Sequence, residues 1–497
     1  MNLMPTMRDS TGRPAMARRL LFIIGAVVSA SGIAMLPAAL VSALYGEQDS
    51  WAILAAAVIT MICGAVGWTI FGQSGILTTK EGFAAVGLSW FVMSVFGTLP
   101  YVLSGDIAHV LNAFFETASG YTTTGASIVP DPGTLSKGIL FWRSTTQWIG
   151  GMGVIVLSIA ILPLLGVGGV QLARAESPGP TPDRLTPRFQ ETAKRLWWVY
   201  VGLTVIEFGL LWIGDMDVFQ AANHSMTTMS TGGFGTEASS IDGFSSYTQW
   251  VITFFMFVAG ASFALHFRAL REPRSYLKNA EFGLYSMIFL GAVVLITGGL
   301  LEPGVRFGDA LRDAAFTAGT LITTTGFATA DFGAWRPALQ VLVIGLMLLG
   351  GMAGSTAGGI KTFRLGILAK AALADLRRIV HPKAIFVIRF GKNRVRDDVV
   401  ESIQSFFLFY ITLFLVSTFL ISFIDANIRE NLDLITSVSA VAASIGNIGP
   451  GLGDVGPVEN YLAIPMVGRT YLALLMIVGR LEIFPVLLLF TRDLWKR

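Results

Sequence analysis

The sequence has little charge and almost no cysteine. Only 13% of its 497 residues are Asp, Glu, Lys or Arg, whereas soluble domains carry about 25%. Hydrophobic residues make up 53% of the chain and the mean hydropathy is +0.65, so the composition predicts a polytopic membrane protein. The one cysteine, Cys63, excludes an internal disulfide framework. The net charge of +3 is too small to indicate nucleic acid as a partner.

The sequence also lacks the residue arrangements of an enzyme. His109, His266 and His381 show no metal-ligand spacing, and no nucleophile lies in a pattern with a base. An intramembrane enzyme or sensor would need paired catalytic groups inside its spans, and these are absent from the sequence. We therefore expect no enzyme activity and no organic cofactor.

Apolar segments of membrane-spanning length run through the whole chain. Each approaches the ~20 residues needed to cross the hydrocarbon core. The first is longer than the roughly 7–15-residue core of a signal peptide, so we expect it to be retained. The ten predicted crossings are 20–44, 51–71, 83–103, 141–165, 197–213, 247–267, 282–300, 339–370, 403–424 and 470–489.

Charged residues divide the connecting loops into two classes. Basic residues gather in the loops 174–195, 268–278 and 361–396, and acidic residues gather in the loops between them. Basic residues in short loops mark the cytoplasmic side. Both chain ends are basic as well, so we expect a multi-pass protein in the lipid of a bacterial inner membrane, with both termini in the cytoplasm.

A short stretch rich in Ser, Thr and Gly recurs, and no copy contains a carboxylate. The copies read SGYTTTGAS at 119–127, MSTGGF at 229–234, ITTTGF at 322–327 and GNIGPG at 446–451. Extended backbone at membrane depth is tolerated only where it is buried in protein or lines a water-filled path. One such run alone is commonly a helix cap or a small-residue packing site. Four runs, each after a short amphipathic segment, predict a repeated unit of helix, pore helix, filter and helix.

The chemistry of these stretches suits a dehydrated cation. Glycine reaches backbone angles closed to other residues, so successive carbonyls can point at one axis, and rings of carbonyls replace the water around potassium in known filters. We expect Glu116 and His224, nine residues before two of these glycines, to cap or brace their pore helices. The predicted filter glycines are Gly125, Gly233, Gly326 and Gly449.

The predicted fold is all-α, with four pseudo-repeats around one pore and two additional N-terminal transmembrane helices. The predicted division is 1–78 for the two leading spans, then 79–175, 176–270, 271–397 and 398–497 for the four pore repeats.

A run of five glycines interrupts the inner span of the third repeat. Each glycine disfavours a helix by about 1 kcal/mol relative to alanine, which favours a broken helix, although close helix packing through small residues is an alternative. We interpret 350–359 as a gate loop beneath the filter, held by few contacts.

Two charged residues, Arg480 and Glu482, lie in the middle of the last predicted span. Either they form a pair that joins helices, or Arg480 faces the loop as a positive barrier. The predicted gate residues are Gly350, Gly351, Gly354, Gly358, Gly359, Lys361 and Arg480.

Taken together, these motifs resemble the Trk/Ktr/HKT superfamily of potassium transporters, and in particular the membrane subunit of bacterial Trk potassium-uptake systems. The matching pieces cover nearly the whole chain, and the two leading spans are a feature of the Trk branch. The pieces are FETASGYTTTG (115–125), WIGGMGV (148–154), ILPLLGVGG (161–169), RAESPGP (174–180), HSMTTMSTGGF (224–234), AGSTAGGIK (353–361), GNIGPGLG (446–453) and GRLEIF (479–484).

The resemblance implies a homodimer with one pore per subunit and a cytoplasmic nucleotide-binding ring that regulates it. It also implies that glycine at position 125 accompanies a preference for potassium over sodium. The second and fourth filters depart from Thr-Thr-Gly, so strict fourfold symmetry is not expected. The ion-coordinating residues implied beside the four glycines are Thr123, Thr124, Thr231, Gly232, Thr324, Thr325, Asn447 and Ile448.

The sequence therefore predicts a gated, potassium-selective pore through which the inside-negative potential drives uptake, at about 2.3 kcal/mol per charge per 100 mV. The alternative is a cation transporter coupled to sodium or protons. Such a transporter needs a titratable or second-ion site near the filters, for which Glu116 is the candidate in the sequence.

Overall fold

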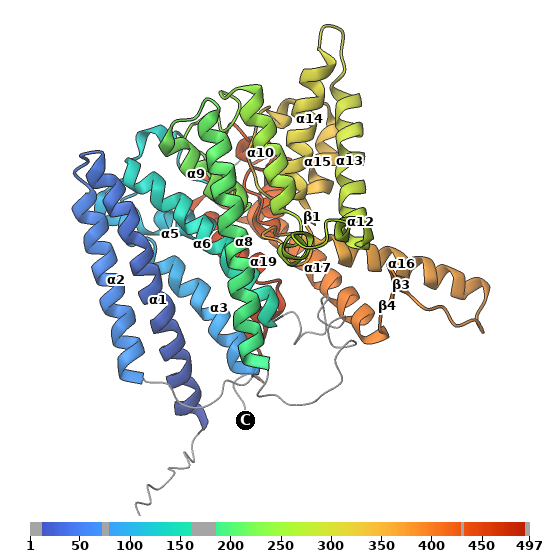
Figure 1. Ribbon diagram of the computed structural model, residues 1–497, viewed down its shortest axis with the longest axis horizontal. Coiled ribbons are helices and arrows are strands. Elements are labelled where there is room, and N and C mark those ends of the chain that lie inside the picture. Colours follow the sequence, from blue (N-terminus) through green and yellow to red (C-terminus); the bar gives the residue numbers. More distant parts are fainter. Residues whose placement is uncertain (1–11, 72–78, 162–184, 429–431, 493–497) are drawn as a thin grey trace, which may run out of the picture.

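The computed structural model describes residues 12–71, 79–161, 185–428 and 432–492, and helices dominate all four ranges (Figure 1). The two leading helices, α1 (Gly12–Leu44) and α2 (Ser50–Phe71), pack side by side at one edge of the molecule. Glycines allow this close approach, because a Cβ on Gly64 would lie 2.4 Å from the backbone nitrogen of Ser29. Small residues at helix contacts are typical of membrane proteins.

Among the described residues, six helical segments are long and apolar enough to cross a membrane. They are the two leading helices and the outer helix of each predicted repeat. The prediction of a helical, multi-pass membrane fold is therefore confirmed. The four outer helices are α3 (Thr79–Phe96) continued by α4 (Leu99–Ser104), α8 (Leu185–Ile213), α13 (Ala280–Leu300) and α17 (Asp397–Ile428).

The predicted inner helices do not form four uninterrupted apolar spans. The inner helix of repeat one, α6 (Lys137–Ile161), is continuous but carries polar side chains. In repeat two, α10 (Ser246–Ala259) and α11 (Phe263–Ala269) meet at 99°. The third inner span is broken at the predicted place, between α15 (Pro337–Met347) and α16 (Thr362–Val380).

The fourth inner span is also broken, between α19 (Met466–Arg480) and α20 (Phe484–Leu489). We expected continuous helices over 247–267 and 470–489. Glu482 and Ile483 instead have positive φ angles of 56° and 66°, which an α-helix does not allow. Each break is stabilised by contacts from a distant part of the chain, which the local sequence does not reveal.

Four shorter helices precede the predicted filters: α5 (Val110–Tyr121), α9 (Val218–Met229), α14 (Phe307–Ile322) and α18 (Leu434–Gly446). The first begins at Val110, after a turn at Gly105, whose φ is 88°. The last two turns of these helices are buried at the centre of the molecule.

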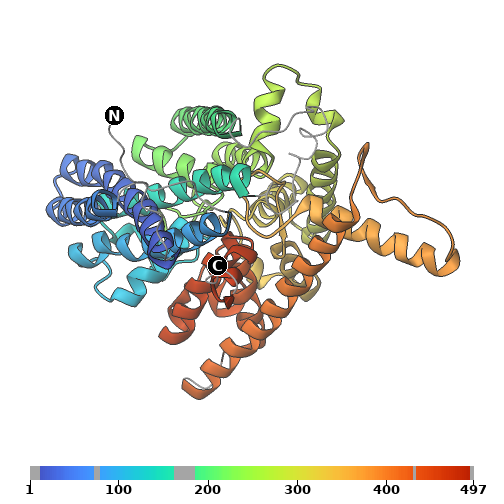
Figure 2. The same ribbon diagram turned by 90° about the horizontal axis from the view of Figure 1, so that it is seen from below.

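Buried hydrophobic clusters join each repeat to the next. Ile155 packs with Tyr200 between repeats one and two, Ile252 with Phe316 between two and three, and Met347 with Ala443 between three and four. The largest cluster includes Phe115, Trp142 and Met476, and it joins repeat four to repeat one. Figure 2 shows the repeats following one another around the centre, from cyan through green and yellow to red.

Two small sheets complete the described structure. The strands β1 (Leu349–Gly350) and β2 (Ile360–Lys361) are parallel and enclose the predicted gate loop. The strands β3 (Arg389–Phe390) and β4 (Asn393–Arg394) form a hairpin after α16, and α16 projects away from the other helices in both views (Figures 1 and 2). The first eleven residues, part of the predicted basic loop 174–195 and the last five residues lie outside the described residues.

Candidate functional site

The four pore helices end in the same way. In each, the residue before the filter glycine donates its backbone N–H to a carbonyl five residues earlier, a bond of the Schellman type that closes a helix C-terminus. The four bonds are Thr124 to Ser119 at 2.8 Å, Gly232 to Thr227 at 2.8 Å, Thr325 to Thr320 at 2.8 Å and Ile448 to Ala443 at 3.0 Å. The chain therefore leaves every pore helix in the same direction.

We call residues 123–125, 231–233, 324–326 and 447–449 filter segments one to four. Each begins with a residue in the left-handed region, and their φ angles of 51° to 57° agree within a few degrees. A β-branched threonine rarely adopts this conformation, and such strained residues cluster at functional sites. The residues are Thr123, Thr231, Thr324 and Asn447.

The glycines that end the segments have no room for a side chain. Their φ angles are positive, from 75° to 101°. The space for each Cβ is occupied by the carbonyl oxygen of the residue that precedes the next segment's glycine. From the Cβ position to that oxygen, the distances are 2.1 Å for Gly125 and Gly232, 2.0 Å for Gly233 and Thr325, 1.9 Å for Gly326 and Ile448, and 2.8 Å for Gly449 and Thr124.

These contacts lead from segment one to two, from two to three, from three to four, and from four back to one. The four segments therefore close a ring of backbone, and one carbonyl oxygen lies at each junction. The ring contains no carboxylate, and its side chains are buried. Chemically, such a ring offers neutral oxygen ligands, which suit a monovalent cation that has lost its water.

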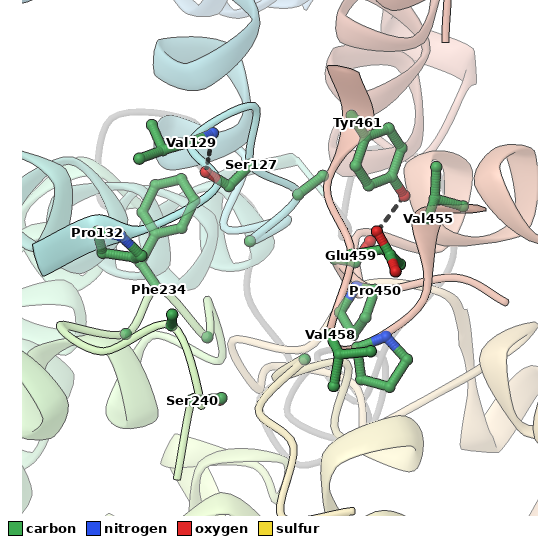
Figure 3. Close-up of a pocket in the computed structure, with 18 of the residues that line it drawn as sticks. Ser127, Val129, Pro132, Phe234, Ser240, Pro450, Val455, Val458, Glu459 and Tyr461 are labelled. Atoms are coloured by element: carbon green, nitrogen blue, oxygen red, sulfur yellow. Dashed lines mark hydrogen bonds between the residues drawn. The ribbon is translucent and has the colours of Figure 1, made fainter. Parts of the chain in front are cut away.

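A cavity of about 100 Å³ opens at the glycine ends of the four filter segments (Figure 3). All four filter glycines line it, together with residues that follow them in the chain, and Glu237 and Glu459 add carboxylates to its wall. Tyr461 also lines it; its hydroxyl donates to the Gly449 carbonyl at 2.7 Å, and its backbone N–H donates to the Ser127 carbonyl at 2.9 Å. No motif in the sequence indicated a role for Tyr461.

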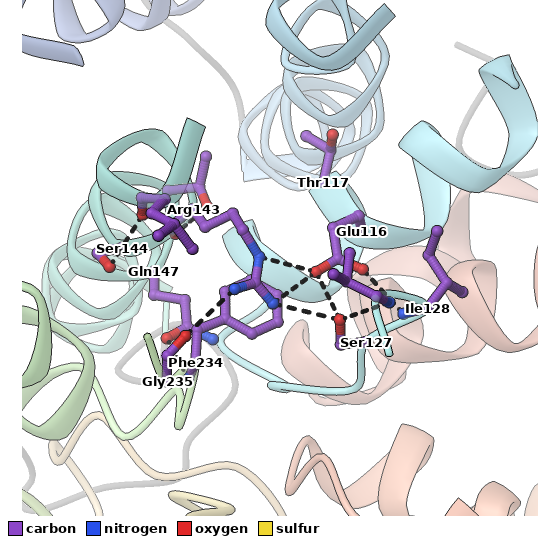
Figure 4. Close-up of polar contacts among 12 residues, drawn as sticks. Glu116, Thr117, Ser127, Ile128, Arg143, Ser144, Gln147, Phe234 and Gly235 are labelled. Atoms are coloured by element: carbon purple, nitrogen blue, oxygen red, sulfur yellow. Dashed lines mark hydrogen bonds and ion pairs between the residues drawn. The ribbon is translucent and has the colours of Figure 1, made fainter. Parts of the chain in front are cut away.

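Glu116 braces the backbone that follows segment one, rather than its pore helix (Figure 4). One carboxylate oxygen accepts from Nε and Nη2 of Arg143 at 2.9 and 2.8 Å, and the other accepts from the Ile128 N–H at 3.0 Å. Arg143 also donates to the Gly235 carbonyl at 3.3 Å, so the pair connects the exits of segments one and two. An ionisable residue inside a predicted span was the signal for Arg143, and the sequence analysis missed it.

Three other side chains also hold the backbone in or just beyond the filter segments. His224 lies at the position of repeat two that corresponds to Glu116, and its Nε2 is 3.1 Å from the Thr236 hydroxyl, just beyond segment two. Gln147, on α6, donates from Nε2 to the Gly232 carbonyl at 2.7 Å and accepts from the Phe234 N–H at 3.1 Å. Asn447 donates from its side chain to the Thr124 hydroxyl at 3.0 Å, which connects segments four and one.

The predicted gate loop lies against the pore-helix ends. The Gly358 N–H donates to the Thr324 hydroxyl at 2.7 Å, and the Thr356 hydroxyl donates to the Met229 carbonyl at 3.1 Å. A Cβ on Gly358 would lie 2.3 Å from the Gly446 carbonyl oxygen. The loop therefore contacts the ends of the second, third and fourth pore helices, on the side of the ring opposite the cavity.

The expectation that this loop has few contacts is wrong. Its backbone also accepts from the Phe263 N–H at 3.0 Å and donates, through Met352, to the Gly260 carbonyl at 2.8 Å, so the break in repeat two holds the loop. Gly350 and Gly358 pack together so closely that a Cβ on Gly350 would lie 2.0 Å from the Gly358 oxygen. The glycines allow tight packing rather than mobility.

Buried charges surround the loop. Arg480 donates from Nη1 to the Thr356 carbonyl at 2.7 Å, Lys361 donates to the Ala357 carbonyl, and Glu281 accepts from the Ala353 N–H at 2.7 Å. Glu482 does not pair with Arg480. Its carboxylate instead accepts from Arg364 on α16 at 2.5 Å, which connects the break in repeat four to the helix that follows the loop.

The chain is similar to known proteins along nearly its whole length. A protein-family model described as "Cation transport protein" matches residues 49–301 and 292–496. The Trk system potassium uptake protein TrkH of Halomonas elongata is 36% identical over 488 residues, which cover 97% of this chain and 99% of that protein. The protein of the same name from Escherichia coli K12 is 37% identical over 479 residues, covering 95% and 97%.

A solved structure is similar as well. The crystal structure of the potassium transporter TrkH from Vibrio parahaemolyticus superposes with a TM-score of 0.88 at 34% identity, and the match covers 97% of this chain and all of that one. These relatives are transport proteins, not enzymes. Because the family model and the relatives cover nearly the whole sequence, the chain belongs to the TrkH family of cation transport proteins.

Proposed function

We propose that this chain is the pore-forming subunit of a bacterial potassium-uptake system. The observation that carries the proposal is the closed ring of four filter segments, with a carbonyl oxygen at every junction between neighbouring glycines. The named potassium transporters among its relatives support the choice of cation. The ion is the transported substrate, and no organic cofactor is needed for its passage.

The proposed ligands are backbone carbonyl oxygens of the twelve residues in segments one to four. Potassium loses its water only if several oxygens replace it at once, and a ring built from four chain segments offers them from all sides. Glu237 and Glu459, on the cavity wall, attract cations toward the ring from outside. The inside-negative membrane potential then drives entry, at about 2.3 kcal/mol per charge per 100 mV.

The gate we propose is the loop 350–359 together with Lys361 and Arg480. Two contacts support this proposal: the loop is bonded to the Thr324 hydroxyl of segment three, and Arg480 is bonded to the loop. A buried guanidinium at this depth repels a potassium ion strongly, because a low-dielectric site screens charge poorly. Ion passage therefore requires both the loop and Arg480 to move.

The proposed orientation has both termini and the basic loops in the cytoplasm of a cell with an inner membrane. We also propose a homodimer and a cytoplasmic nucleotide-binding ring as partners. The exposed end of α16 supports a docking face, since Leu376, Ile379 and Val380 are 60–77% exposed and lie beside the exposed basic residues Arg377 and Arg378. Lipid covers the apolar outer helices.

One observation favours the alternative, a transporter coupled to protons. Glu207 on α8 is fully buried, and neither carboxylate oxygen has a hydrogen-bond partner among the described residues. The helix α8 packs against the second pore helix, α9. Glu116, the candidate from the sequence, is instead paired with Arg143. An unpartnered carboxyl inside a membrane span is a functional-site hypothesis by default.

One experiment separates the two functions. Purified protein in liposomes is given isotopic rubidium under a fixed membrane potential, with and without a pH gradient. We expect rubidium uptake to depend on the membrane potential alone. Potassium should inhibit this uptake, and sodium should inhibit it only weakly. If uptake by the wild type requires the pH gradient and uptake by Glu207→Gln does not, the protein is the coupled transporter. No uptake under either condition would overturn both.

Gly125→Ser should reduce the potassium-to-sodium uptake ratio about tenfold, a change of ~1.4 kcal/mol. The added side chain collides with the Gly232 carbonyl, which lies 2.1 Å from the Cβ position, and pushes that oxygen out of the ring. Gly105→Ser is the matched control: its φ of 88° is equally unfavourable for serine, but nothing lies within 4 Å. An unchanged ratio in Gly125→Ser would remove this glycine from the filter.

Arg480→Ala should raise rubidium flux into liposomes about tenfold without any partner, because a hydrogen bond to a charged group contributes about 1.5–3 kcal/mol. The potassium-to-sodium ratio should stay the same, since the ring is untouched. Arg469→Ala, on the same helix and about three turns away, is the control and should leave flux unchanged. Flux at background in a well-folded Arg480→Ala dimer would mean that Arg480 holds the pore together.

Reversing Arg377 and Arg378 to Glu together should abolish most co-purification of the regulatory ring, because both cations lie on the proposed docking face. The dimer should elute unchanged from a sizing column. The control reverses Arg271 and Arg274, two exposed cations of the basic loop 268–278, with the same change in net charge. If both double variants retain the ring equally well, α16 is not its docking site.

A further inference from the structure

Filter segment two lacks a side chain that its counterparts have. Segments one and three carry Thr124 and Thr325 before the glycine, and each hydroxyl lies 2.7 Å from the hydroxyl of the threonine two residues earlier. Segment four carries Ile448 at this position, and segment two carries Gly232. With no side chain, Gly232 can neither make the threonine bond nor fill the space beside its own backbone.

Gln147 occupies that space. A Cβ on Gly232 would lie 2.3 Å from Cδ, 2.4 Å from Oε1 and 2.8 Å from Nε2 of Gln147. The glutamine comes from α6 of repeat one and is fully buried. Figure 4 shows it on the same helix as Arg143, extending toward Phe234. The amide of repeat one therefore stands where the side chain of segment two would be.

The amide also holds the backbone on both sides of Gly233. Nε2 donates to the Gly232 carbonyl at 2.7 Å, and Oε1 accepts from the Phe234 N–H at 3.1 Å. The guanidinium of Arg143 lies 4.1 Å from the centroid of the Phe234 ring and holds the residue that follows segment two from another direction. Gly233 has a φ of 75°, a conformation from which a glycine departs easily unless its neighbours are held.

The bond to Gly232 matters because that oxygen is part of the ring. It is the oxygen that lies 2.1 Å from the Cβ position of Gly125, at the junction of segments one and two. A carbonyl oxygen has two lone pairs, so the one that Gln147 leaves free can face an ion. The amide thus fixes the direction of a ring carbonyl without removing it as a ligand.

We propose that Gln147 is a specificity-determining positioning residue, which supplies to segment two the support that threonine supplies within segments one and three. It acts through the Gly232 carbonyl and keeps the ring too wide for sodium, because an unsupported carbonyl can move inward around the smaller ion. This inference rests on the proposed potassium-uptake function. Glycine at position 232 is then the consequence of glutamine at position 147, since both side chains cannot share the space.

The test compares uptake of rubidium and sodium by wild type and Gln147→Met. Methionine has nearly the same length and volume but forms neither bond, so a role in packing alone predicts an unchanged ratio. We expect the rubidium-to-sodium ratio to fall about three- to tenfold, the change expected for losing one or two hydrogen bonds. The thermal stabilisation by potassium relative to sodium should shrink in parallel. A ratio and a stabilisation equal to wild type would overturn the proposal.

A rescue experiment covers the case in which Gln147→Met does not fold. Gly232→Thr alone should be unstable, because its Cβ collides with Gln147. Gln147→Ala alone should be poorly selective. The double variant, with the space vacated by one change and refilled by the other, should recover both the folded dimer and most of the selectivity. A double variant no better than the worse single variant would overturn the proposal.

The same measurements distinguish failure of the inference from failure of the proposed function. If wild type shows no preference for rubidium over sodium, the proposed function itself is wrong. If wild type is selective and the Gln147 variants are equally selective, the function stands and only the role of Gln147 falls.

Discussion

The close contact between each filter glycine and the carbonyl of the next segment is the constraint on which the rest of the structure depends. At 1.9–2.8 Å from the Cβ position, these oxygens leave no room for any side chain. Each segment therefore takes its position from its neighbour, and the ring exists only when all four repeats are in place. The hydrophobic clusters serve this end, because one of them joins every pair of successive repeats and the largest joins the fourth to the first.

Side chains from outside the ring support the backbone of the filter segments and of the residues that follow them. Three of the repeats use different side chains for this. Repeat one uses the Glu116–Arg143 pair, repeat two uses Gln147 from its neighbour, and repeat four uses the Tyr461 hydroxyl. Because these supports differ, the fourfold pattern of the backbone does not extend to the side chains. Buried polar groups of this kind specify a single arrangement, since leaving either partner unsatisfied costs about 1–3 kcal/mol.

The sequence could predict the features that depend on neighbouring residues alone. The pore helices and the filter glycines recur at fixed spacing, and the outer helices are apolar throughout, so both could be found by inspection. The breaks at Gly260 and Glu482 could not, because each is held by a residue more than 90 positions away, Met352 and Arg364. Gln147 was missed for the same reason. A glutamine in a predicted span indicates a polar contact, but only the packing of α6 against segment two identifies the partner.

The packing of the predicted gate loop, 350–359, changes how its glycines are interpreted. Glycines suggested a mobile segment, yet Thr356 and Met352 are bonded to repeat two and Gly358 is bonded to Thr324 of repeat three, and Arg480 adds a bond from repeat four. For the gate proposed above, a regulator that opens the pore would have to bind the open state more tightly than the closed state by the free energy of these bonds. The pair of Arg364 and Glu482 offers a route, because it connects α16, which projects from the molecule, directly to the helix that carries Arg480.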